Sequence, residues 1–150
     1  MTLEPSPVVA KALQQATVDL TDLALLGKQA HWNIQGSRFR ALHLQLDEIV
    51  DEVRAASDEV AERLAAIGGF PDARAATVAQ QSGLKQVDAG ALRVDEVYPQ
   101  FEELLLVVSD RIKASLDAVD EEDHLTADIL IGIATGLEKQ AWMLRSAAQG

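Results

Sequence analysis

Apolar side chains recur every three or four residues along most of the chain, the spacing that places them on one face of an α-helix. In the first such segment, about residues 7–33, the spacing holds from Val9 to Leu26. A second segment covers about residues 37–67 and ends at the sequence Gly68–Pro71, a strong helix stop. The first half of the chain therefore predicts two long helices joined by a short turn.

The second half predicts another pair of helices. A third helix should begin between residues 92 and 99, because Pro99 is tolerated only near a first turn, and should continue to about residue 119. A fourth, capped by Asp123 or Thr126, should continue to about residue 147. We expect a short helix over about 72–81, inside the long connection, and no strand, because no alternating pattern is present.

Length and composition favour one all-α domain covering residues 1–150. Hydrophobic residues make up 48% of the 150 residues but aromatic residues only 4%, which suits helices packed through aliphatic side chains. A connection of roughly 25 residues can cross a bundle from end to end, the feature that separates ferritin-like four-helix bundles from simple up-down ones. The expected fold is a ferritin-like four-helix bundle with a short helix between its second and third helices.

The sequence is expected to have neither a signal peptide nor a membrane-spanning segment. The first residues lack the basic and then apolar run of a signal peptide. The most apolar runs, 104–108 and 129–134, are too short to span a bilayer. We expect a soluble, cytoplasmic protein without membrane contact, and leave association with the nucleoid open.

Five side chains suggest a metal site that one chain cannot complete. Within the second helix, His43, Asp47, Asp58 and Glu62 fall in an arc of roughly 100°, and His31 lies on the helix before. Asp47 and Asp58 are nevertheless about 16 Å apart along the helix axis. Ligands of one metal ion must all lie within about 2.0–2.6 Å of it.

A two-fold dimer would close this site. If a second copy of the helix packs antiparallel across an axis near residues 52 and 53, the pair His43/Asp47 of one chain comes level with the pair Asp58/Glu62 of the other. A turn near residues 35–37 places His31 at the height of His43. Imidazole and carboxylate donors suit iron, manganese or zinc, and the absence of cysteine excludes thiolate sites and disulfides.

The pattern resembles the Dps family, the mini-ferritins also called DNA-binding proteins from starved cells. The resemblance covers nearly the whole chain. It is carried by Lys28–Gly36, Phe39, Leu42–His43, Asp47, Asp58, Ala61–Arg63, Gly68–Pro71, Thr126–Leu130 and Leu137–Trp142.

The resemblance implies a hollow dodecamer with a ferroxidase centre between subunits, in which His31, His43 and Asp47 of one chain face Asp58 and Glu62 of its two-fold partner. It implies oxidation of Fe(II), preferably by hydrogen peroxide, storage of the ferric mineral, and protection of DNA. Zinc is a competitor for such ligands.

Two further groups of residues carry weaker hypotheses. The family places acidic residues around three-fold pores that admit cations, which makes Asp120, Asp123 and Asp128 candidates for an iron-entry pore; Glu121 and His124 are less certain members, and a solvated acidic loop is the alternative. Trp32, next to His31, could quench a stray radical. Trp142 is expected in the core or in an interface.

Direct DNA binding is expected to be weak or absent. The formal charge is -11, the first basic residue is Lys11, and no lysine-rich or arginine-rich tail is present. The leading hypothesis is a ferroxidase that stores iron. The alternatives are a structural protein that coats nucleoid DNA and binds metal incidentally, and a redox-silent helical assembly that holds zinc.

Overall fold

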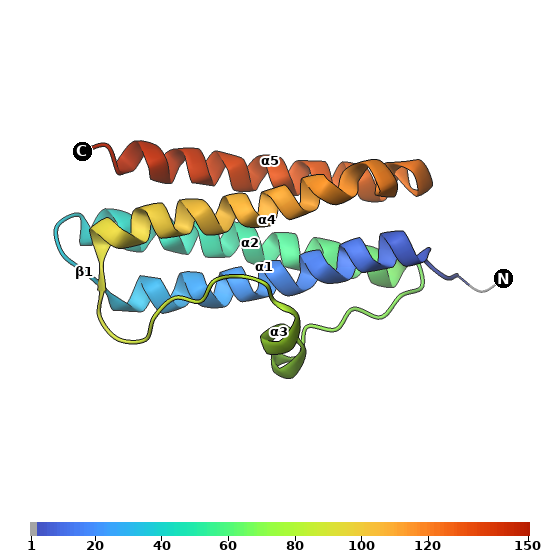
Figure 1. The fold of residues 1–150 in the computed structure, drawn as a ribbon, viewed down its shortest axis with the longest axis horizontal. Coiled ribbons are helices and arrows are strands. Elements are labelled where there is room, and N and C mark those ends of the chain that lie inside the picture. Colours follow the sequence, from blue (N-terminus) through green and yellow to red (C-terminus); the bar gives the residue numbers. More distant parts are fainter. Residues whose placement is uncertain (1–2) are drawn as a thin grey trace.

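Four long helices lie side by side along the length of the molecule in the computed structural model, which describes residues 3–150 (Figure 1). The predicted all-α bundle is confirmed, including the short helix in the long connection. The helices are α1 (Pro7–Asn33), α2 (Phe39–Ala66), α3 (Ala75–Gln81), α4 (Val94–Glu122) and α5 (His124–Ala147). Within residues 3–150, no helix is long and apolar enough to cross a membrane.

The connection between α2 and α4 determines the topology. It returns along the whole bundle, so that α4 begins beside the start of α2 and the two helices run in the same direction (Figure 1). At that end, β1 (Ile34–Gln35) pairs in parallel with β2 (Leu92–Arg93), with Ile34 opposite Leu92. The expectation that the chain has no strand was wrong, because strands of two residues are too short to produce an alternating pattern.

Helix boundaries differ from the predicted ones at two places. A turn with positive φ at Gly36 (128°) and Arg38 (68°) delays the start of α2 to Phe39. α4 continues three residues past the predicted end at 119, because Asp123 is the first residue to leave the helical conformation (φ -154°, ψ 96°). Since α4 begins at Val94, Pro99 lies in its second turn, beyond the first turn in which proline is normally tolerated.

Aliphatic side chains from all four long helices form one core. Its fully buried members include Leu13, Leu20, Leu46, Val53, Phe101, Leu105, Leu130 and Leu137. α1 and α2 approach closely at Gly27, where an added Cβ atom would lie 2.6 Å from Val50 Cγ2. This close approach sets the spacing of the two helices one turn before His31.

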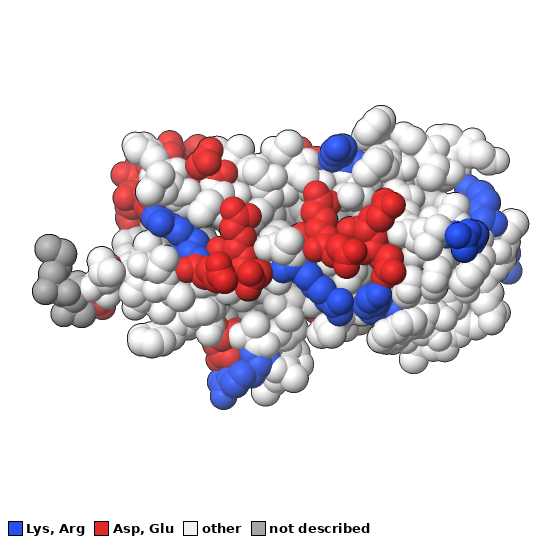
Figure 2. Space-filling model, turned by 180° about the vertical axis from the view of Figure 1, so that it is seen from behind, with Lys and Arg blue, Asp and Glu red and all other residues white. Residues whose placement is uncertain are grey.

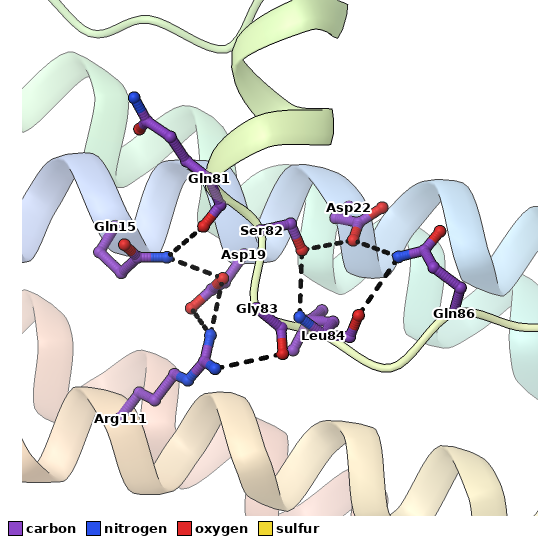
Figure 3. A network of polar contacts seen from close by, with 9 residues as sticks. All are labelled: Gln15, Asp19, Asp22, Gln81, Ser82, Gly83, Leu84, Gln86 and Arg111. Atoms are coloured by element: carbon purple, nitrogen blue, oxygen red, sulfur yellow. Dashed lines mark hydrogen bonds and ion pairs between the residues drawn. The ribbon is translucent and has the colours of Figure 1, made fainter.

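Two buried carboxylates of α1 hold the long connection in place (Figure 3). Arg111 of α4 donates to both oxygens of Asp19 at 3.1 and 3.0 Å and, through Nη2, to the carbonyl oxygen of Gly83 in the connection at 3.2 Å. Asp22 accepts hydrogen bonds from Ser82 Oγ and Gln86 Nε2, both in the connection. The connection is therefore anchored to the bundle by polar contacts as well as by apolar packing.

Candidate metal centre

Two histidines meet at the end of the bundle where α1 turns into α2. His31 lies in the last turn of α1 and His43 near the start of α2. Their rings are stacked, with centroids 3.7 Å apart and an angle of 11° between the ring planes. Phe39 stacks on His43 at a centroid distance of 5.0 Å. The predicted proximity of His31 and His43 is confirmed.

A reciprocal pair of hydrogen bonds orients both imidazoles. His31 Nδ1 lies 2.7 Å from the carbonyl oxygen of His43, and His43 Nδ1 lies 2.8 Å from the carbonyl oxygen of His31. A carbonyl oxygen only accepts, so each Nδ1 carries the proton, and in the neutral ring the lone pair is on Nε2. Metal-binding histidines are commonly oriented by such a bond through their second ring nitrogen. Both Nε2 atoms are therefore free to bind a metal ion.

Asp47 adds a carboxylate to this pair. It lies one helical turn after His43, and its Oδ1 atom is 3.7 Å from His31 Nε2. The ammonium group of Lys28, on α1, donates a hydrogen bond to the same Oδ1 atom. That hydrogen bond lowers the pKa of Asp47 below its ordinary value, so the carboxylate is ionised at neutral pH. We call His31, His43 and Asp47 the histidine half of the site.

Asp58 and Glu62 lie farther along α2, toward its opposite end, and form what we call the carboxylate half. Both side chains are exposed, and among residues 3–150 neither makes a hydrogen bond or an ion pair. Over the same residues, no group of three or more His, Asp or Glu side chains is arranged to hold a metal ion. One chain thus presents two separate halves, and their meeting across a two-fold axis stays a prediction.

Large apolar side chains are exposed next to the two histidines. Trp32 follows His31 on α1, Leu44 follows His43 on α2, and Phe39, which stacks on His43, is 40% exposed. Trp32, adjacent to His31, is 68% exposed. Exposed apolar groups concentrated in one place usually mark a contact with another molecule.

Trp142, on α5, was expected either in the core or in an interface. It is 54% exposed, so the core position is wrong for the single chain.

Carboxylates dominate the face on which α2 lies. Acidic side chains gather along the middle of this face in Figure 2. The exposed acidic residues of α2 are Glu48, Asp51, Glu52, Asp58, Glu59 and Glu62. A surface of this kind attracts divalent cations and repels polyanions.

The acidic candidates around the junction of α4 and α5 are of two kinds: Asp120 lies in the last turn of α4, Asp123 between the two helices and Asp128 in the second turn of α5. Asp120 and Asp128 are exposed, and the Asp120 carboxylate hydrogen-bonds His124 Nδ1 at 2.7 Å, which raises the pKa of His124. Asp123 instead turns toward the bundle: it caps α5 by accepting from two of its first backbone N–H groups. Arg63 of α2 donates to Asp123 at 2.8 Å.

These contacts fix the charge of Asp123. Burial by itself would raise its pKa, but hydrogen bonds from Thr126 and Arg63 outweigh burial and hold the pKa at about 2. Asp123 therefore joins α5 to the end of α2, next to Glu62. The pore role suggested for Asp120, Asp123 and Asp128 stays a prediction.

Two contributors to the site were missed in the sequence. Lys28 was noted only as part of a motif, although it lies three residues before His31 on the same helix, within reach of neighbouring side chains. Arg63 follows Glu62 directly, but its contact with Asp123 spans sixty residues of sequence. A basic residue beside a candidate ligand was the available signal in both cases.

Comparison with known proteins gives consistent matches. A family model described as a ferritin-like domain matches residues 10–149. The DNA protection during starvation protein 1 of Deinococcus radiodurans is 38% identical over 142 residues, covering 92% of this chain and 67% of the relative. The fine tangled pili major subunit of Haemophilus ducreyi is 32% identical over 149 residues, covering 97% of this chain and 77% of the relative.

The match extends to solved structures and to longer relatives. The structure of Dps from Microbacterium arborescens in the high iron form has a TM-score of 0.93 at 30% identity, covering 100% of this chain and 99% of that chain. The chain spans 58% of the length of a second relative from Deinococcus radiodurans, DNA protection during starvation protein 2.

Proposed function

Because this chain belongs to the Dps family of ferritin-like proteins, we propose that it is a cytoplasmic ferroxidase that oxidises Fe(II) with hydrogen peroxide and stores the ferric product inside a hollow dodecamer. The observation that carries this proposal is the histidine half, where two imidazoles use Nδ1 for backbone hydrogen bonds, which leaves the lone pair on Nε2, and an ionised carboxylate lies 3.7 Å from His31 Nε2. Nitrogen and carboxylate donors of this kind suit iron.

The two-fold dimer supplies the remaining ligands in this proposal. His31, His43 and Asp47 of one chain would face Asp58 and Glu62 of its partner, and the reciprocal arrangement would make two centres per dimer. The exposed apolar side chains next to the two histidines, Trp32, Phe39 and Leu44, support a contact at this place. The absence of any ion pair at Asp58 and Glu62 within residues 3–150 supports a role for them outside the single chain.

The reaction consumes both partners of Fenton chemistry. Two Fe(II) ions each lose one electron, one peroxide molecule accepts both electrons, and its two oxygen atoms take up protons and leave as water. The carboxylates of the centre stabilise the more highly charged ferric ion, and open coordination positions admit the oxidant. DNA is protected because no one-electron cleavage of peroxide releases hydroxyl radical. Trp32, which follows His31 on α1, would quench a radical that escapes in this proposal.

Iron would reach the centres through an acidic opening. Asp120 and its hydrogen-bond partner His124 are exposed at the α4–α5 junction and Asp128 is exposed in the second turn of α5; three copies around an axis would concentrate Fe(II) by their negative potential. Asp123 belongs to the same segment, but its carboxylate is held by Arg63 and the end of α5. We therefore expect Asp123 to shape the opening more than to line it.

A structural role without redox chemistry is the alternative. The chain could coat nucleoid DNA and bind metal incidentally, or assemble as its Haemophilus relative, named a pilus subunit, does. The formal charge of -11 and the carboxylates along α2 argue against strong contact with DNA. A site that holds zinc and performs no redox work is a further alternative.

Anaerobic loading with Fe(II), followed by hydrogen peroxide, tests the proposal. We expect rapid formation of ferric absorbance at about two irons per peroxide. The rate should be lost in His31→Ala and in Asp58→Ala, which remove one ligand from each half. Oxidation no faster than in buffer would refute the ferroxidase and leave the structural or zinc-binding alternatives.

A further inference from the structure

A narrow groove runs between the first half of α1 and the second half of α4. The two helices run in opposite directions here (Figure 1). Small apolar side chains form most of its walls, and the groove has a volume of about 470 Å³. This volume lies within the range of about 300–1,000 Å³ that is typical of ligand pockets. The apolar wall residues are Val8, Ala12 and Ala16 of α1 and Ile112, Ala114 and Ala118 of α4.

An ion pair closes one end of the groove (Figure 3). Arg111 donates to both oxygens of Asp19, and Gln15 Nε2 donates to Asp19 Oδ1 at 3.0 Å. Among the residues that line the groove, all of which the structure describes, Asp19 is the only carboxylate. Its charge is already compensated by Arg111, so it does little to repel an anionic ligand.

Lys11 places a positive charge on the rim of the groove. It lies about two helical turns before Asp19, and its side chain is exposed. Among residues 3–150, this ammonium group makes neither a hydrogen bond nor an ion pair. A cation beside an apolar wall suits a ligand that carries one negative group on an apolar body.

The dimensions of the groove favour a single alkyl chain. From Val8 to Asp19, α1 rises about 16 Å, so the volume corresponds to a mean cross-section of about 30 Å². An α-helix with a diameter of about 10 Å would need about 80 Å². An alkyl chain, with carbon contacts at about 4 Å, needs much less. The rise of about 12 Å from Lys11 to Asp19 matches about ten carbon atoms at about 1.25 Å each.

We propose that this groove binds one medium-chain fatty acid, with its carboxylate at Lys11 and its alkyl chain directed toward the Arg111–Asp19 pair. Burial of the alkyl chain against the alanines supplies most of the affinity, and the ammonium group of Lys11 fixes the orientation. The proposal is independent of the ferroxidase, because none of these residues belongs to the histidine half or to the carboxylate half.

Calorimetric titration of the purified protein with decanoate tests the proposal. We expect saturable binding of about one molecule per chain. The affinity should rise from hexanoate to decanoate and then level off at tetradecanoate, because the ion pair stops a longer chain. Ala114→Leu and Ala118→Leu narrow the groove from its exposed side and should each weaken binding at least about ten-fold. Ala65→Leu, an exposed alanine of α2 outside the groove, is the matched control and should bind as the wild type does.

A second comparison tests recognition of the carboxylate. Lys11→Gln should weaken decanoate binding about three-fold, the usual effect of an exposed charge pair. The same variant should bind decan-1-ol, which has no charge, as the wild type does. Lys85→Gln, an exposed lysine of the connection outside the groove, should leave both affinities unchanged.

Three results would overturn the proposal. Equal decanoate affinity in the wild type and both groove variants, with unchanged thermal melts, would show that the ligand binds elsewhere. Equal affinity of the wild type and Lys11→Gln for decanoate would exclude recognition of the carboxylate. No binding of decanoate at all would leave the groove to another occupant, such as apolar side chains of a second copy of the chain. Fe(II) oxidation, assayed in the same preparations, stays a separate test of the proposed function.

Discussion

Mixed assemblies of two defective chains should recover activity, because each proposed centre takes its halves from different subunits. Asp47→Ala damages the histidine half and Asp58→Ala damages the carboxylate half. Either variant alone should be nearly inactive, since every centre then lacks one ligand. The two residues lie about 16 Å apart on α2, so no single centre can use both from the same chain.

The expected recovery follows from the two-fold symmetry. In a mixed dimer, one centre receives both substitutions, and the other receives the intact histidine half of one chain and the intact carboxylate half of the other. With equal amounts of the two chains and random pairing, half of the dimers are mixed. About one quarter of all centres should therefore be intact, giving about 25% of wild-type activity.

Co-expression with two different affinity tags provides the mixed assemblies, and sequential purification on both tags proves mixing. The assay is the initial rate of ferric absorbance after peroxide is added to anaerobically loaded protein. The matched control pairs His43→Ala with Asp47→Ala, which both damage the histidine half, so every centre stays defective. No recovery in the first pair, or equal recovery in both pairs, would refute a centre shared between subunits.

Three further predictions concern stability and charge. Asp123→Ala should lower the free energy of unfolding by about 2 kcal/mol at pH 7, measured by denaturant titration, because it removes a helix cap and leaves Arg63 without its carboxylate; Glu121→Ala, an exposed carboxylate of the same segment, is the control. Since the folded-state pKa of Asp123 is about 2, below its ordinary value of 3.8, its stabilisation is complete above about pH 4 and is lost as the pH falls through 2; a difference between the variants that stays constant down to pH 2 would contradict this. Gly27→Ala should lower the free energy of unfolding, measured by thermal melts, by about 1–3 kcal/mol, because its Cβ would lie 2.6 Å from Val50 Cγ2. The control is Gly132→Ala, whose Cβ would have nothing within 4 Å and which should be neutral or stabilising. A gel-shift assay at physiological salt without divalent metal should show no retardation of duplex DNA, as expected for a chain with a formal charge of -11; a strong shift would show that local basic groups outweigh the net charge.

Local patterns predicted the helices because each helix is a local structure. The apolar spacing placed α1 at its observed bounds, and the long connection predicted the direction of α4. The short helix expected over about 72–81 is α3, which begins at Ala75. Boundaries failed where a single residue's backbone conformation decides them, at Arg38 and at Asp123. The pairing of β1 with β2 could not be seen, because it joins two residues to two others far along the chain.

The candidate site could be predicted to the same extent as the fold. Helical spacing alone showed that His43, Asp47, Asp58 and Glu62 share a face and that one chain cannot bring them together. Helical spacing does not show which residues of other helices each side chain contacts. Lys28 on Asp47, Arg63 on Asp123 and the exposure of Trp142 all depend on the neighbouring helix or on its absence.

The sequence by itself determined the helices and predicted the candidate ligands and a second subunit to complete the site, since these depend on residue identity and on the regular geometry of a helix. Only the tertiary structure decided the state of the ligands. The reciprocal bonds that leave Nε2 free on His31 and His43, and the ammonium group that occupies Asp47, require α1 and α2 to meet at a particular rotation and height. The relative position of α1 and α2 is set by their close packing at Gly27 against Val50. This contact joins residues of different helices, so the apolar spacing within either helix does not reveal it.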